Sequence, residues 1–240
     1  AKDAAFKLVT TKSEIKNAAL AKIADALIKN SAEILAANKT DIENAEKKGT
    51  RKAMIDRLTL TDARIADMAE GVRQVAALDD PIGKIIDEWE RPNGLKIAKK
   101  RVPIGVIGII YEARPNVTVD AAVLCLKSSN AVILRGGSEA ICSNKAIMKI
   151  MQDAAYSAGI PEGSMNIVED TSRATATELM KMNGYIDLLI PRGSAGLIRS
   201  VVENATVPVI ETGAGNCHIY VDGDCDFDMA IKICENARVS

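Results

Sequence analysis

The residues best suited to chemistry in this sequence follow short apolar runs that are typical of buried strands. VPIGVIGII is followed by YEARPNVT, AVILR by GGSEA, LLIP by RGSAG, and VPVI by ETGAGN. Glycine lets a backbone approach a phosphate, a helix N-terminus offers unpaired N–H groups, and arginine adds a bidentate charge. We therefore expect a site for an anionic ligand, with three arginines at one sheet edge: Arg114, Arg135 and Arg192.

Two common phosphate-binding fingerprints are missing from the sequence. It contains no G-x-x-x-x-G-K-[ST], which argues against a P-loop NTPase, and no G-x-G-x-x-G, the ordinary dinucleotide signature. Any one of the glycine-containing turns could serve only the backbone geometry of a strand-to-helix connection. Their recurrence after several strands favours ligand binding.

The segment ETGAGNCH places a carboxylate, a thiol and the sole imidazole close together. Glu211 follows the apolar VPVI, so we expect apolar surroundings, a raised pKa and a role as general base. Cys217 and His218 are neighbours on a predicted strand and would point to opposite faces, which argues against a catalytic dyad. Cys125 and Cys142 lie among apolar residues of predicted helices, where most thiols are inert.

Cysteine and histidine usage bears on metals and disulfides. The five cysteines show no C-x-x-C spacing, and there is one histidine. This pattern argues against a disulfide framework and against a structural zinc site, so no metal site is expected. We find no convincing nucleophile in the sequence.

From residue 102 to 240, strand-like and helix-like segments alternate. This rhythm predicts an α/β domain, a doubly wound parallel sheet of the nucleotide-binding (Rossmann-like) type with helices on both faces. Such sheets bind ligands at the carboxyl ends of their strands. VPVIETG and HIYVD are expected as the last strands, and DFDMAIKICENARVS as a last helix.

Residues 1–85 are predicted to be helical. Thr11 with Glu14, and Thr40 with Glu43, have the spacing of capping boxes, and the charged residues of this part fit a solvated face. Residues 86–101 predict a projecting hairpin that turns at Pro92-Asn93-Gly94. Its strands could pair with a neighbouring subunit as an oligomerisation arm or pack on their own chain.

Composition excludes several classes of function. The 31 basic and 32 acidic residues give a net charge of -1, and aromatic residues make up 3%. These values argue against a broadly cationic nucleic-acid or membrane-surface binder and against base-stacking platforms. No apolar run reaches the length of about 20 residues that spans a bilayer. The opening AKDAAFKLVT lacks the apolar core of a signal peptide, so we expect a cytoplasmic protein.

Four long strings carry a family resemblance: YEARPNVTVDAAVLCLKSSNAVILRGGSEA, GIPEGSMNIVED, YIDLLIPRGSAGLI and PVIETGAGNCHIYVD. Together with the helical start they resemble the gamma-glutamyl phosphate reductases of the aldehyde dehydrogenase superfamily. The resemblance implies NADPH-dependent reduction of L-glutamyl 5-phosphate to the semialdehyde with release of phosphate, the second step of proline biosynthesis. It also implies a cysteine nucleophile and a positioned oxyanion donor.

The resemblance assigns roles to individual residues. Asn116 matches an asparagine of the oxyanion hole, and Glu211 the position of a general base in many members. Arg135 takes the place of a lysine at the adenosine ribose, where it could meet the 2′-phosphate of NADP. We expect Arg114 and Arg192 to hold the anionic groups of the substrate. The remaining cofactor residues implied are Gly136, Gly137, Ser138, Glu139, Gly193 and Ser194.

The sequence departs from that family at its end. The family's cysteine lies in an R-P-S-x-C-N-type motif soon after a stretch like ENARVS, and these 240 residues do not reach it. We therefore expect a cofactor-binding portion without its catalytic cysteine domain, inactive alone. The alternatives are a stand-alone nucleotide-binding module and a dehydrogenase with another substrate. A homo-oligomer and functional coupling to glutamate 5-kinase are further expectations from the resemblance.

Overall fold

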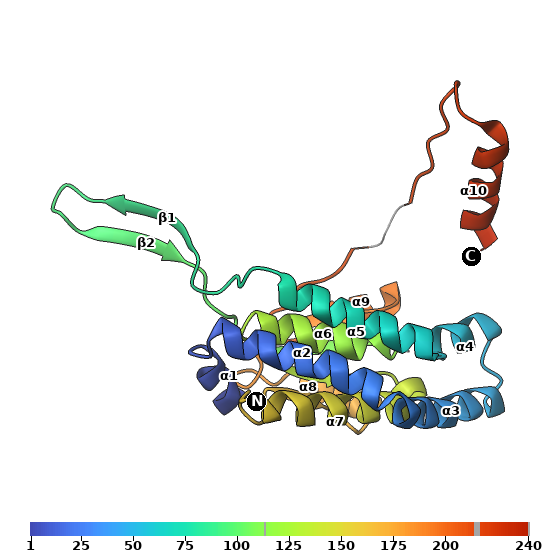
Figure 1. Cartoon of the computed structure of the whole chain (residues 1–240), viewed down its shortest axis with the longest axis horizontal. Helices are drawn as coiled ribbons and strands as arrows, with labels where there is room; N and C mark the ends of the chain where they lie inside the picture. Colours follow the sequence, from blue (N-terminus) through green and yellow to red (C-terminus); the bar gives the residue numbers. More distant parts are fainter. Residues whose placement is uncertain (113, 214–216, 240) are drawn as a thin grey trace.

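The chain folds as an α/β protein in a computed structural model, which describes residues 1–112, 114–213 and 217–239. The first part is helical, as predicted, and its helices pack on the layer formed by two later helices, α6 and α7 (Figure 1). The bounds of these first elements are α1 Lys2–Leu8, α2 Ser13–Lys29, α3 Ser31–Lys47, α4 Lys52–Leu58 and α5 Asp62–Ala77.

Four parallel strands form the central sheet in the order β5-β4-β3-β6. The strand β3 is buried along its whole length, as its uninterrupted apolar run predicts. The strands are β3 Val106–Tyr111, β4 Ala131–Arg135, β5 Met165–Ile167 and β6 Leu188–Arg192. The helices that follow them are α6 Asn116–Lys127, α7 Ile141–Ser157 (after the short 3-10 helix Ser138–Ala140), α8 Arg173–Leu179 and α9 Ala195–Asn204.

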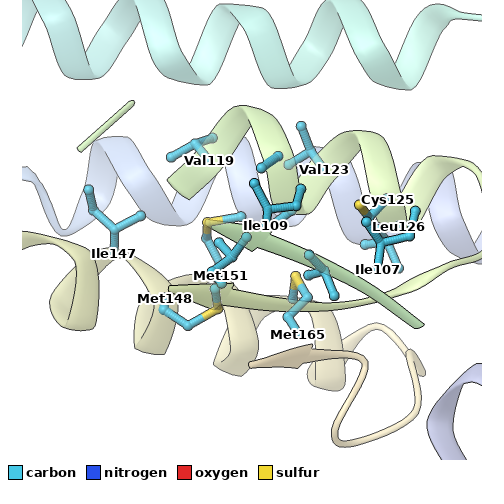
Figure 2. Packing of buried hydrophobic residues seen from close by; sticks show 14 of the residues in the cluster. Ile107, Ile109, Val119, Val123, Cys125, Leu126, Ile147, Met148, Met151 and Met165 are labelled. Carbon is cyan, nitrogen blue, oxygen red and sulfur yellow. The ribbon is translucent and has the colours of Figure 1, made fainter. Parts of the chain in front are cut away.

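The connections make the sheet doubly wound. The chain advances from β3 through α6 and α7 to β5, then returns across the sheet to β6. Because such crossovers are right-handed, α6 and α7 cover one face and α8 the other. Figure 2 shows Ile109 of β3 near Val119 and Val123 of α6, with Met151 of α7 in the same core. The predicted fold class is thus confirmed.

Two of the predicted strands are not formed as expected. VPVIETG contributes one bridge, in which Leu189 pairs with Val209, and Leu189 N donates to Pro208 O at 2.8 Å. Because Pro208 has no backbone N–H, it cannot donate a hydrogen bond that would extend the pairing with β6. HIYVD, residues 218–222, is extended without strand pairing, and its residues are exposed. The final predicted helix is present as α10, Phe227–Val239.

Both predicted capping boxes are wrong. Thr40 lies inside α3, where its hydroxyl donates to Ala36 O, and Thr11 Oγ1 donates to Lys7 O at 3.1 Å. Each hydroxyl bonds the carbonyl one turn earlier instead of a following N–H, a choice open to threonine near helices. The helix α2 consequently starts at Ser13 after Lys12, without a side-chain cap.

The hairpin forms where the sequence places it. Strands β1 (Ile85–Glu90) and β2 (Lys96–Lys100) pair antiparallel, with Trp89 opposite Ile97, and project away from the rest of the chain (Figure 1). Gly94 has φ +82°, a conformation that glycine adopts without steric cost. Every residue of β1 is exposed, so the hairpin does not pack on its own chain.

A buried charge cluster lies between the start of α2, the residues after α5 and the end of α6. The Lys16 side chain is 1% exposed, and its Nζ lies 2.6 Å from Asp80 Oδ2. Nζ also donates to Ser129 Oγ at 2.8 Å and to Lys127 O at 3.2 Å. Lys127 Nζ in turn donates to Asn17 Oδ1 and Ala76 O. The cluster ties the helical region to the domain that carries the sheet.

Among the described helices, none is long and apolar enough to cross a membrane.

Candidate functional site

A cleft opens at the carboxyl ends of β3 and β6, the place expected for a ligand in this fold. It has a volume of about 1230 Å³ and adjoins a smaller cavity of about 380 Å³. Parallel pairing sets Tyr111 opposite Arg192, so the segments that follow these two strands begin side by side. The predicted residues that line the cleft together are Arg114, Asn116, Arg192, Gly193, Ser194 and Glu211.

The helix α9 begins in this cleft. Ser194 precedes its first residue with extended backbone, and its hydroxyl accepts from Leu197 N at 3.4 Å. The first turn of a helix has N–H groups without acceptors inside the helix, which makes it a favourable place for an anion. Gly193 and Ser194, for which the sequence predicts a role in cofactor binding, lie at this helix start.

Glu112 is a residue of the site that sequence reasoning missed. Its carboxylate accepts from Ser194 N at 2.8 Å and from Ser194 Oγ at 2.7 Å, so it is itself an anion at the start of α9. A Cβ on Gly193 would lie 2.7 Å from Glu112 Cδ, which explains the glycine there. The sequence signal for Glu112 is an acidic residue directly after a buried strand, in the segment that also contains Arg114.

We expect Glu112→Ala to lower the free energy of unfolding by about 1 kcal/mol, the scale of a helix N-terminal anion and cap. Glu112→Gln should lose less, because an amide oxygen can still accept from Ser194 N. Chemical denaturation measures both variants. Glu43→Ala, an exposed glutamate inside α3, is the matched control and should leave stability nearly unchanged. Equal stability of Glu112→Ala and wild type would contradict the capping role.

The turn after β4 holds the other predicted cofactor residues, and it does not line the cleft. Arg135 Nη2 donates to Ser172 O at 3.0 Å and also to Thr171 O, whereas its Nε is buried and has no hydrogen-bond partner among the residues that the structure describes. Burial lowers the pKa of Arg135, and the charges of Glu139 and Asp170 oppose that shift. Gly137 is half-buried, and Ser138 is exposed at the start of the 3-10 helix.

Gly136 in that turn is packed against a buried polar chain. Tyr111 Oη and Thr118 Oγ1 lie 2.7 Å apart, and Thr118 donates to Asn144 Oδ1 at 2.9 Å. Burial raises the pKa of Tyr111 to about 12, so the phenol stays protonated. A Cβ on Gly136 would lie 2.4 Å from Asn144 Nδ2 and 3.1 Å from Tyr111 Oη.

Gly136→Ala should therefore destabilise the fold by about 1–3 kcal/mol, the usual cost of overpacking a tight interior. Gly71→Ala is the control, because Gly71 lies inside α5 with no atom within 4 Å of its Cβ position. That change should be neutral or stabilising, since alanine favours a helix. Thermal unfolding compares the two variants, and a Gly136→Ala protein as stable as Gly71→Ala would contradict this packing.

The surroundings expected for Glu211 are not found. Glu211 lines the cleft but is exposed, and Ile210 before it is 55% exposed. The apolar environment fails because the VPVI segment contributes one bridge to the sheet instead of a buried strand. Residues 214–216 of the same motif lie outside the described residues.

Two of the five cysteines have raised pKa values. Cys125 lines the cleft, but burial raises its pKa to about 12, so it is a thiol at neutral pH. Burial and a hydrogen bond with Asp41 raise the pKa of Cys142. Cys217 and His218 are exposed. Over the described ranges, no group of three His, Cys, Asp or Glu residues could hold a metal ion.

The parallel sheet with helices on both faces and a cleft at its strand ends defines the chain as a doubly wound α/β protein. Residues 2–240 match the family model described as "Aldehyde dehydrogenase family". The chain belongs to the aldehyde dehydrogenase family.

Curated relatives are similar over the whole chain. Gamma-glutamyl phosphate reductase of Clostridium beijerinckii is 60% identical over 240 residues, which are 100% of this chain and 58% of the relative. The protein of the same name from Heliobacterium modesticaldum is 61% identical over 238 residues, 99% of this chain and 57% of the relative. The chain thus spans less than two thirds of the length of these relatives.

Solved structures agree with the fold. The crystal structure of gamma-glutamyl phosphate reductase from Thermotoga maritima matches with a TM-score of 0.90 and 46% identity, over 100% of this chain and 58% of that one. The Saccharomyces cerevisiae structure of the same name gives 0.82 and 34%, over 99% of this chain and 60% of that one. An acetylating aldehyde dehydrogenase from Geobacillus thermoglucosidasius, 19% identical with a TM-score of 0.67 over 90% and 44%, shares the fold.

Proposed function

We propose that the complete protein is an NADPH-dependent reductase of L-glutamyl 5-phosphate and that this chain is its cofactor-binding portion. The reaction converts the acyl phosphate, NADPH and a proton into glutamate 5-semialdehyde, phosphate and NADP⁺. The observation that carries the proposal is the cleft in which Arg114, Asn116 and Arg192 lie beside the start of α9. The names of relatives about 60% identical support the choice of substrate.

The charged and amide side chains of the cleft suit this chemistry. Arg114 and Arg192 can hold anionic groups of the substrate, such as its phosphate, through charge-assisted hydrogen bonds. Asn116 Nδ2 donates to Asp120 Oδ2 at 3.3 Å, which leaves its second N–H for an oxyanion. Glu211, exposed in the same cleft, is placed to exchange a proton with water.

The residues present fit a dinucleotide. The N–H groups of the first turn of α9 suit its pyrophosphate, and the Arg135 guanidinium, whose Nε has no hydrogen-bond partner among the described residues, supports a role in anion binding. In this proposal Arg135 meets the 2′-phosphate, which favours NADP over NAD, and the residues from Gly136 to Glu139 face the adenosine end. NADPH, when bound, supplies the hydride.

The other parts of the proposal concern the protein as a whole. A cysteine outside these 240 residues would be the nucleophile, because none of the cysteines here matches its position in the family. Residues 1–85 would be the helical part of the cofactor domain, 86–101 an oligomerisation arm, and 102–240 the Rossmann-like domain. A cytoplasmic homo-oligomer that works together with glutamate 5-kinase completes the proposal.

The test is turnover by the complete gene product. It should oxidise NADPH in the presence of glutamyl phosphate, and in reverse form NADPH from the semialdehyde, phosphate and NADP. Omitting phosphate should abolish the reverse reaction. A purified protein that binds NADPH but turns over no acyl phosphate or aldehyde would instead support a stand-alone nucleotide-binding module.

A further inference from the structure

Two charged side chains at the junction of the two cavities have no role in the account so far. Arg57 comes from the end of α4, and Asp120 lies one turn after Asn116 on α6. Both residues line both cavities. Arg57 belongs to the helical part, in which the sequence predicts no site residue, and the fold brings it to the cleft.

Two charged residues beside Arg57, Asp56 and Arg64, are bonded to each other. Arg64 Nη1 donates to Asp56 O and Thr59 O, both at 2.6 Å, and Arg64 Nη2 pairs with Asp56 Oδ1 at 3.2 Å. These bonds fix the segment that carries Arg57. Within the described ranges Arg57 has no ion-pair partner, and the one hydrogen bond of the Asp120 carboxylate is from Asn116.

The environment of Asp120 favours a bound cation. Withdrawal from water raises the pKa of Asp120, although the hydrogen bond from Asn116 and the charge of Arg192 lower it. The Asp120 side chain is exposed in the cleft, where it can accept a charge-assisted hydrogen bond from an ammonium group. Arg57 can donate charge-assisted hydrogen bonds to a carboxylate of the same ligand.

We propose that Asp120 and Arg57 form a subsite for the α-ammonium and α-carboxylate groups of an α-amino-acid substrate. The inference rests on the proposed function and names the residues that recognise the amino-acid end of the glutamyl chain. A zwitterion carries both charges on one carbon, so it requires an anion and a cation at one place in the cleft. The other end of the substrate then lies in the same cleft, which Arg192 also lines.

The experiment uses the complete gene product in the reverse direction, with NADP, inorganic phosphate and two aldehydes. One is glutamate 5-semialdehyde, and the other is 5-oxopentanoate, the same chain without the amino group. Asp120→Asn should raise KM for the amino aldehyde about tenfold, the loss expected for one hydrogen bond to a charged group. It should leave KM for 5-oxopentanoate and for NADP unchanged. Arg57→Gln should raise KM for both aldehydes, because both carry the carboxylate.

Matched controls separate this effect from a general change of charge. Asp67→Asn removes a carboxylate that lines only the smaller cavity, and Lys52→Gln removes a cation from the same helix as Arg57. Both variants should behave like wild type. An equal rise in KM for the two aldehydes in Asp120→Asn, or a fall in kcat with KM unchanged, would overturn the subsite while the reductase activity stands.

A second measurement decides the subsite if neither aldehyde is oxidised, which would refute the proposed function. Calorimetric titration of the chain with L-glutamate and with glutarate compares ligands that differ by the amino group. Glutamate should bind more tightly, and Asp120→Asn should remove that advantage. Equal binding of the two ligands by the wild-type chain would overturn the subsite.

Discussion

Replacing Asp80 with alanine should lower the free energy of unfolding by about 3 kcal/mol, because it leaves a buried ammonium group without its counter-charge. Lys16 is 1% exposed and lies 2.6 Å from Asp80. Its remaining contacts, Ser129 Oγ and Lys127 O, are neutral acceptors. Urea unfolding measures the loss.

Two further variants make the interpretation specific. Asp79→Ala removes the neighbouring aspartate, which pairs with Lys84 at the exposed surface, and should have little effect. The double variant Lys16→Met/Asp80→Ala removes both buried charges and should recover much of the stability lost by Asp80→Ala alone. An Asp80→Ala protein as stable as Asp79→Ala would contradict the buried pair.

The same carboxylate predicts a pH dependence of stability. Burial alone would raise the pKa of Asp80, but hydrogen bonds from Lys16, Ser13 and Ile82 N outweigh it and hold the pKa below 3.8. Because the folded-state pKa is depressed, the contribution is complete above the unfolded-state value and is lost as pH falls through the folded-state value. Wild type should therefore lose more stability below about pH 4 than Asp80→Asn does.

Replacing Arg135 with serine should weaken NADPH binding about 100-fold and change NADH binding far less, because two charge-assisted hydrogen bonds to the 2′-phosphate would be lost. Arg135 stands at the end of β4, and its Nε has no partner within the described part of the chain. Fluorescence titration with both dinucleotides measures the selectivity.

Controls for this prediction follow from the contacts of Arg135. Arg135→Lys keeps the charge and should retain intermediate selectivity for NADPH, since lysine binds phosphate as a point charge. Arg91→Ser, in the exposed turn of the hairpin, should bind both dinucleotides like wild type. Equal weakening of NADPH and NADH in Arg135→Ser would place the residue away from the 2′-phosphate and show that its bonds to Thr171 and Ser172 only support the turn.

Much of the fold could be predicted from local patterns. The strand β3 and the hairpin turn at Pro92-Asn93-Gly94 could be predicted because each depends on residues that are adjacent in sequence. The capping-box predictions were wrong because a threonine hydroxyl can bond either a preceding carbonyl or a following N–H, and sequence spacing does not distinguish the two. The prediction of a strand after α9 was wrong because an apolar composition does not ensure that the segment pairs with a neighbouring strand.

The site could be predicted only where its residues directly follow strands. The fold brings together in one cleft four residues at or just after strand ends: Arg114, Asn116, Arg192 and Ser194. Glu112 was missed because its partner Ser194 is 82 residues away, and Arg57 because it reaches the cleft from a separate helical layer. Such contacts depend on tertiary packing. Arg135 was placed at the correct sheet edge but does not line the cleft, since its side chain turns toward Thr171 and Ser172.

The most direct test of the central claim is equilibrium binding of NADPH to this 240-residue chain, measured by calorimetry. We expect one saturable site with NADPH bound more tightly than NADH, and loss of that preference in Arg135→Ser. A folded chain that binds neither dinucleotide, with Gly136 and the start of α9 intact, would contradict its assignment as the cofactor-binding portion of a reductase.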